Sequence, residues 1–314
     1  MRLVLLVFVL FLSFGCHTSA GISVQQTKVA RKPLNRIAVK LEGPANYDKS
    51  DSDDGKPYDH KPRVVVIDER AGKYEFRWIG SDKKEKIIKY QRNGAIDVLV
   101  SANVLKNENG KYLYIYRVEN LSSSANRLSG FTVQNFASEA KPLEFDFDNS
   151  YIGAMSDIIP RFTEGKWLRY GILLTHKPVI APGLKIELQL ESPALPGVVE
   201  CKADGGEFGT IGVGEEMPPE LERLALGTKD WPYGYTIGPV DKLAEMNKSE
   251  RSKYIRENLP KFQEAGWMSS GTAEIYKSIL EREDLAGAFK QAKKDLDKEF
   301  ITSEVYHIIE GLNQ

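Results

Sequence analysis

Short runs rich in valine, isoleucine, tyrosine and phenylalanine repeat from Arg63 to about residue 192, and they constrain the fold more than any other feature of the chain. In the run KYLYIYRVENL, tyrosines occupy every second position, at Tyr112, Tyr114 and Tyr116. Alternate residues of a β-strand share one face, so this run predicts a strand with an aromatic face. Turn residues separate many of the runs, at Ala71-Gly72, Asn93-Gly94, Asn109-Gly110, Pro182-Gly183 and Pro196-Gly197. Regular short strands with such turns predict an antiparallel β-sandwich.

The character of the sequence changes after the last of these runs. A glycine-rich stretch covers 201–219, and from about Val240 apolar residues recur at three- and four-residue spacings, which predicts helices. Hydrophobic residues make up 41% of the 314 residues, enough for a sizeable core. We therefore expect a mainly β protein: an antiparallel β-sandwich over 63–215, an aromatic and glycine-rich connector over 216–239, and a small C-terminal α-helical module over 240–314.

Two residues of the helical module, a serine and a proline, allow local structural predictions. Ser249 precedes an apolar-periodic segment and is expected to cap a helix. Pro260 lacks a backbone N–H, so it is expected to open or kink the next helix.

The N-terminus has the pattern of a secretory signal peptide over residues 1–20. Arg2 is followed by an unbroken apolar run from Leu3 to Leu12, which is too short for a comfortable membrane span. Small residues before Gly21 allow ordinary cleavage there, whereas Gly15-Cys16 resembles a bacterial lipoprotein site with lipidation at Cys16. Both alternatives predict an exported protein that is periplasmic, in the outer envelope or secreted. A membrane is expected as a partner only through a lipid anchor at Cys16.

Residues 21–62 are polar and weakly periodic, which predicts a linker or a mobile N-terminal segment. The segment contains an acidic cluster that we interpret as solvated rather than as a calcium site, because its spacing fails the calcium-loop template. The cluster consists of Asp48, Asp51, Asp53 and Asp54. The net charge of the whole chain is −1, so nucleic acid is not an expected partner.

Catalytic, cofactor-binding and metal-binding residues are not predicted. Cys201 is left alone once Cys16 is removed or lipidated, and it has no nearby histidine in the sequence. We interpret it as a small buried thiol at a strand end. The histidines show no metal-ligand spacing; they are His17, His60, His176 and His307.

Aromatic residues cluster in the connector at Trp231, Tyr233 and Tyr235. In a loop, such residues can stack on a sugar or anchor a partner. The alternative is that the loop fills the join between the sandwich and the helices.

The tyrosine run raises the same question, and strand register answers it. A three-residue turn over 108–110, with Gly110 in the left-handed conformation, places Tyr114 opposite Val104 and Tyr116 opposite Ala102. Only this register separates apolar from polar side chains between the two faces. It predicts that the tyrosines line the core rather than form a binding platform.

Two segments, YLYIYRVENLSSS and VIAPGLKIELQLESPALPG, resemble segments of uncharacterised bacterial secreted β-sandwich proteins. The resemblance implies export and a sandwich, and it brings no catalytic residues.

We expect an exported non-enzymatic binding or structural protein of the bacterial cell envelope or secretome, with a protein or polymer partner. The alternative is an extracytoplasmic polymer (glycan) hydrolase or a carbohydrate-binding module.

Export predicts that the native mature protein lacks Met1 and the apolar run. Intact mass spectrometry of protein from its own host measures this directly. A mass that begins at Gly21 indicates ordinary cleavage, and a mass that includes diacylated Cys16 indicates a lipoprotein. A retained leader would contradict the prediction.

Overall fold

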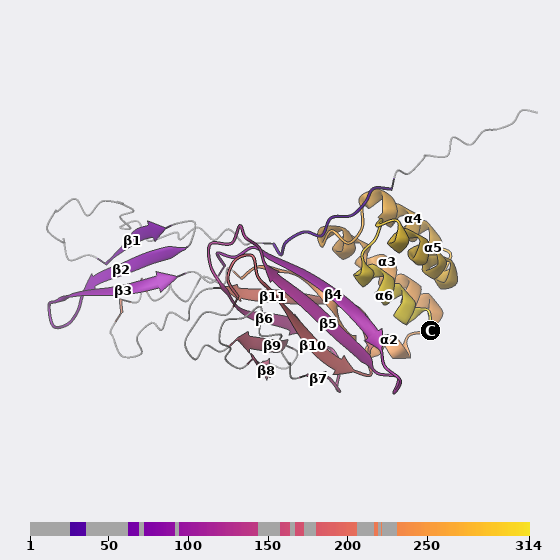
Figure 1. Ribbon diagram of the computed structural model, residues 1–314, viewed down its shortest axis with the longest axis horizontal. Helices are drawn as coiled ribbons and strands as arrows, with labels where there is room; N and C mark the ends of the chain where they lie inside the picture. The colour runs from indigo at the N-terminus through magenta and orange to yellow at the C-terminus, as the bar shows by residue number, and fades with distance from the viewer. Residues whose placement is uncertain are drawn as a thin grey trace, which may run out of the picture.

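The computed structural model describes residues 26–35, 62–68, 72–91, 94–143, 158–163, 167–172, 180–205, 217–218, 221 and 231–314. Every strand pairing in these ranges is antiparallel. The strands form three sheets, and the helices follow them along the chain (Figure 1). The predicted fold class, mainly β with a sandwich and a C-terminal helical module, is confirmed.

Two of the sheets pack face to face and form the sandwich. The four-stranded sheet runs β4 (Val98–Lys106), β5 (Tyr112–Asn120), β10 (Lys185–Ser192), β7 (Lys141–Pro142). The five-stranded sheet runs β12 (Tyr233–Val240), β11 (Leu195–Gly205), β6 (Leu128–Gln134), β9 (Trp167–Ile172), β8 (Ile158–Thr163). Strand β12 begins inside the range expected for the connector, because Tyr233 pairs with Lys202 of β11 and continues the sheet.

The third sheet is separate from the sandwich, although the sequence predicted one sandwich over 63–215. It runs β1 (Arg63–Asp68), β2 (Lys73–Ile79), β3 (Glu85–Gln91) and lies at one end of the molecule (Figure 1). Its buried residues form a cluster of their own: Val64, Tyr74, Phe76, Trp78 and Leu221. Alternation identifies a strand but does not reveal which sheet it joins, so the sequence pattern could not separate this unit.

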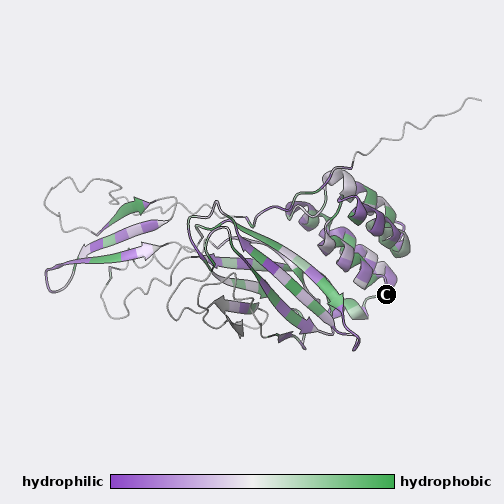
Figure 2. Ribbon diagram, viewed as in Figure 1, coloured by the Kyte–Doolittle hydropathy of each residue, from purple (hydrophilic) through white to green (hydrophobic). Residues whose placement is uncertain are grey.

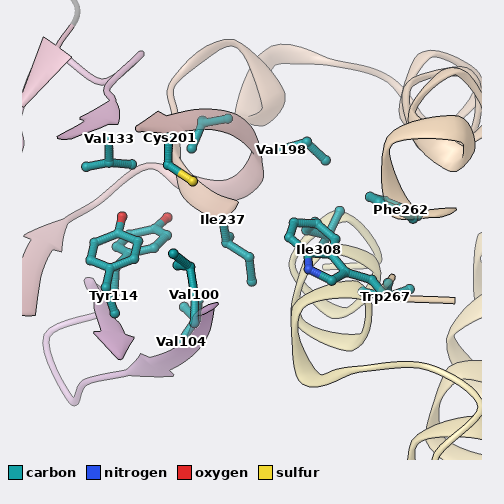
Figure 3. Close-up of a cluster of buried hydrophobic side chains, with 14 of the residues drawn as sticks. Val100, Val104, Tyr114, Val133, Val198, Cys201, Ile237, Phe262, Trp267 and Ile308 are labelled. Atoms are coloured by element: carbon teal, nitrogen blue, oxygen red, sulfur yellow. The ribbon is translucent and has the colours of Figure 1, made fainter. Parts of the chain in front are cut away.

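The tyrosine run lies in the core, as its register predicted. Tyr114 pairs with Val104 and Tyr116 with Ala102, and Gly110 has a φ of 78° in the turn. Both tyrosine side chains are fully buried. The Tyr114 hydroxyl donates to the Ala194 carbonyl at 2.7 Å, which satisfies its polar end. Figure 3 shows Tyr114 between the two sheets, close to Val133 and Cys201.

The helical module contains five helices in the described part of the chain. They are α2 (Lys242–Glu245), α3 (Lys248–Glu264), α4 (Ser270–Leu280), α5 (Leu285–Asp297) and α6 (Ser303–Leu312). Asn247, not Ser249, caps α3, because its side chain and that of Glu250 form a reciprocal capping box. Pro260 lies inside α3 rather than at the start of a new helix.

The core of the sandwich continues into the helical module as a single cluster of buried residues. In Figure 3, Ile237 from the sheet lies beside Ile308, and Trp267 and Phe262 extend the cluster into the helices. Helix α6 packs against β4, β11 and β12. At Gly311 a Cβ atom would come within 2.7 Å of Pro196, so glycine permits this close contact between helix and strand.

A buried carboxylate joins α6 to the edge of the four-stranded sheet. Glu304 is 1% exposed, and its Oε1 accepts a hydrogen bond from the Ala102 backbone N–H at 2.8 Å. Its Oε2 accepts one from the Arg31 guanidinium at 2.9 Å. Strand β4 is an edge strand, so Glu304 satisfies a backbone donor that has no strand partner on that side.

Residues 26–35 cross from the helices to both sheets, although the sequence predicted a linker or mobile segment over 21–62. The Leu34 N–H donates to the Val98 carbonyl of β4, and Asn35 forms a bridge with Tyr233 of β12. Gly266, with a φ of 70°, is in close contact with this segment. A Cβ atom at Gly266 would be 2.7 Å from the Ala30 carbonyl oxygen. The acidic cluster between Asp48 and Asp54 lies outside the described residues.

Replacing Tyr114 with alanine is expected to lower the free energy of unfolding by about 3–5 kcal/mol, as for other large buried aromatic residues. The loss comes from the cavity and from the hydrogen bond to Ala194. Thermal and urea melts measure it. Tyr114→Phe, which keeps the ring, should lose only about 0.5–1.5 kcal/mol. An unchanged midpoint for Tyr114→Ala would contradict burial of the tyrosine run.

Replacing Glu304 with alanine is expected to cost about 2–3 kcal/mol, because it leaves the Ala102 N–H without an acceptor and removes charged hydrogen bonds. Urea denaturation of the full chain measures the loss. Glu310→Ala is a control on the same helix, with a more exposed carboxylate. Equal effects of the two substitutions would argue against the role of Glu304 at the join.

Candidate functional site

The five-stranded sheet has one face in the core and one face that carries polar and aromatic side chains. Along β11, the residues Val199, Cys201 and Ala203 are buried in the sandwich. Their neighbours Glu200 and Lys202 therefore project from the opposite face. The same alternation applies to β6 and β9, where the core residues are Phe131, Val133, Leu168 and Tyr170.

Strand register arranges the outer side chains in rows across four neighbouring strands. In the first row, Gln134 pairs with Trp167, and Glu200 pairs with Tyr235. The Glu200 N–H also donates to the Gln134 side chain, which connects the two halves of the row. In the second row, Thr132 pairs with both Arg169 and Lys202, and Lys202 pairs with Tyr233.

The third row contains two glycines and ends next to an aromatic residue. Gly130 pairs with Gly171 and with Asp204. Trp231 precedes β12, and the hydrogen bond from the Ala203 N–H to the Pro232 carbonyl continues the pairing toward it. We call the side chains of the three rows the array: Thr132, Gln134, Trp167, Arg169, Glu200, Lys202, Asp204, Trp231, Tyr233 and Tyr235.

Lys202 occupies the middle of the array between two indole rings. Its Nζ lies 4.2 Å from the ring centroid of Trp167 and 6.0 Å from that of Trp231. The ammonium is attracted to the face of an aromatic ring at such distances. Two tryptophans from opposite edges of the array therefore lie close to the same positive charge.

Arg169 and Asp204 form an ion pair beside Lys202. The Arg169 Nη2 lies 2.8 Å from the Asp204 Oδ2. Burial raises the pKa of the Asp204 carboxyl above its ordinary value, against the opposing charges of Arg169 and Lys202. A Cβ atom at Gly130 would come within 3.0 Å of the Asp204 carboxylate, so glycine leaves space for the pair.

The helical module borders the array at Tyr235. The Lys261 Nζ of α3 lies 5.5 Å from the ring centroid of Tyr235. A small cavity of about 20 Å³ lies next to this ring, enough for about one water molecule. Its lining includes Leu34, Asn35 and Trp267, so residues 26–35 close this edge.

The structure brings together the three aromatic residues predicted to form a contact loop, but two of them belong to a strand. Tyr233 and Tyr235 are in β12, and Trp231 comes just before it. Tyr235 lies at the join with the helices, as one alternative predicted. Tyr233 is 39% exposed on the array. Tyr235 therefore borders the join between the sandwich and the helices, and Tyr233 is accessible on the surface of the array.

Sequence reasoning missed the partners of these aromatic residues. No local pattern singles out Trp167, Arg169 or Lys202, because each lies in a run of the sequence far from Trp231. Part of the array could be read from the sequence. In ECKAD, polar residues alternate with small ones, which places Glu200, Lys202 and Asp204 on one face of a strand.

A larger apolar groove, of about 590 Å³, lies where β6 and β12 end near α2 and α3. Its main polar groups already have partners in the protein. The Asn135 side chain makes two hydrogen bonds with Ala137, the Asp241 carboxylate accepts from the Ser138 N–H, and the Tyr254 hydroxyl accepts from the Val198 N–H. This groove therefore offers fewer free polar groups for recognition than the array does.

Cys201 is fully buried in the middle of β11, rather than at a strand end, and burial raises the pKa of its thiol well above the ordinary value. His307 contacts Asn103 at 2.6 Å, whereas His17, His60 and His176 lie outside the described residues. Within the described ranges, no group of three or more metal-ligating side chains occurs.

Carboxylates of the array are poorly spaced for glycoside hydrolysis. Glu200 and Asp204 are four residues apart on one strand, so their backbones are roughly 13 Å apart at ~3.3 Å per residue. Catalytic carboxyl pairs lie about 5–10 Å apart. Asp204 is also held by Arg169. Glu200 and Asp204 therefore do not form a carboxyl pair suited to that reaction, whereas the array can bind by stacking and hydrogen bonding.

None of the helices in the described part of the chain is long and apolar enough to span a bilayer.

No protein-family model matches this chain, and the search of curated proteins also gives no match.

The Cys201 thiol is expected to be unreactive in the folded chain, because the nucleophilic thiolate is suppressed by burial. A thiol reagent at pH 8 should detect no thiol in native protein that begins at Gly21, and one after denaturation in guanidinium. Fast labelling of the native protein would show that the sandwich core around Cys201 is open.

Proposed function

We infer that this chain is an exported, non-enzymatic binding protein of the bacterial envelope or secretome, and that the array binds a polysaccharide chain. The leader pattern over residues 1–20 supports export. The observation that carries the binding proposal is the array itself, in which aromatic rings flank a centre of hydrogen-bonding side chains.

Sugar rings have apolar faces and hydroxyl edges, so they are matched by aromatic rings next to polar groups. Trp167 and Trp231 supply rings on opposite sides of Lys202. Thr132, Gln134 and Glu200 supply side-chain donors and acceptors between them. Strands β9 and β12 are three positions apart in the sheet, or roughly 14 Å at ~4.8 Å per spacing. That span favours a chain of several sugars over a single sugar.

The hydrolase alternative receives less support from the described residues. The array has the aromatic residues that a glycan site needs, but its two carboxylates are far apart along β11, and one is neutralised by Arg169. A carbohydrate-binding module agrees better with this arrangement.

Single substitutions Trp167→Ala and Trp231→Ala are each expected to weaken polysaccharide binding about tenfold. An aromatic contact contributes about 0.5–1.5 kcal/mol beyond its buried area, and 1.4 kcal/mol corresponds to about tenfold in Kd. Affinity electrophoresis in gels that contain soluble neutral or acidic polysaccharides measures the change.

Ile87→Ala is a matched control, because Ile87 is an exposed apolar residue on the separate sheet, 47% exposed. It should leave migration unchanged. Thermal melts of all variants separate lost binding from lost folding. If the wild-type protein is retarded by no polysaccharide in the panel, the proposed function is wrong.

A further inference from the structure

The second row of the array is made of hydrogen-bond donors. The Arg169 guanidinium, the Thr132 hydroxyl and the Lys202 ammonium follow one another across β9, β6 and β11. The Tyr233 hydroxyl ends the row on β12. Arginine and lysine side chains have no acceptor atoms, and hydroxyl groups can donate. Such a row is matched to acceptor groups, most strongly to an anionic one.

Among the described residues, Lys202 carries the positive charge of this row that forms no ion pair, although its charge acts on the nearby Asp204 carboxyl. Within the part of the chain that the structure describes, its Nζ contacts two indole rings and forms no ion pair. The charge of Arg169, in contrast, is paired with Asp204. An anionic group on a ligand could therefore pair with Lys202 without first breaking an ion pair.

The other charges near the array limit which anion fits. Glu200 lies two residues from Lys202 on the same face, and Asp204 lies two residues away on the other side. Lys261 and Glu264 of α3 border the array with opposite charges. These carboxylates disfavour a dense polyanion such as nucleic acid, and the net charge of the chain is −1. A single carboxylate placed against Lys202 satisfies the same constraints.

We propose that the ligand of the array is an acidic polysaccharide, whose sugars bear carboxylate groups, and that Lys202 selects for this charge. The carboxylate is placed against Lys202 and Thr132, and the neighbouring sugar rings are placed against Trp167 and Trp231. This inference rests on the proposed polysaccharide-binding function and names its substrate class.

The test compares each acidic polymer with its own methyl ester, which has the same backbone without the charge. Suitable pairs are polygalacturonate, alginate and hyaluronan, each with its methyl ester, at low and at physiological salt. The wild-type protein is expected to bind at least one free acid tenfold or more tighter than the corresponding ester. Added salt should reduce that preference.

Variants of Lys202 and Trp167 separate charge selection from stacking. Lys202→Gln should abolish the preference for the acid over its ester, and Lys202→Arg should retain the preference. Trp167→Ala should weaken binding to both forms. Lys106→Gln, on a different sheet, is a charge-matched control and should change neither.

The outcomes distinguish the two proposals. Equal binding of acid and ester, or a Lys202→Gln variant that keeps the preference, overturns the acidic-ligand inference and leaves polysaccharide binding intact. Absence of binding to every polymer overturns the proposed function. Single-stranded oligonucleotide serves as a further probe, and binding of it as tight as that of the acidic polymer would show that the row recognises polyanions in general, which also overturns the inference.

Discussion

The buried carboxylate of Glu304 connects three parts of the chain that are far apart in sequence. It accepts hydrogen bonds from the Ala102 N–H on the edge of the four-stranded sheet and from Arg31 in the N-terminal segment. A buried carboxylate is costly unless such partners surround it, so the helix, the edge strand and the segment are energetically dependent on one another. The continuous core then extends from the sandwich through Ile308 to the helices (Figure 3).

This join also determines the position of the array. Residues 26–35 pass from Glu304 to the two sheet edges, where Asn35 bridges to Tyr233. Strand β12 is itself an edge strand, and its outer side carries the aromatic end of the array. The site is therefore built on a strand that is held from one side by β11 and from the other by the N-terminal segment. Two layers of support of this kind keep the rings of a binding surface in place before a ligand arrives.

Much of the local structure could be predicted from the sequence, because strand periodicity and turn chemistry are local properties. The register of β4 and β5 followed from one requirement, that Tyr114 and Tyr116 share a face with apolar partners. Hydropathy along these strands shows the same alternation (Figure 2). The cap at Asn247 was missed in favour of Ser249, because both residues suit the position and only the reciprocal bond with Glu250 decides between them.

The sequence by itself determined the alternation of faces, the β-then-helix order and the burial of the tyrosine run. Only the tertiary structure decided which strands became neighbours, and this decided the site. Trp167 and Trp231 both lie near the Lys202 ammonium because β9, β6, β11 and β12 pair in that order, although these strands are far apart in the chain. Local periodicity fixes the face of each residue, whereas strand order depends on packing between segments distant in the chain, which no local pattern encodes.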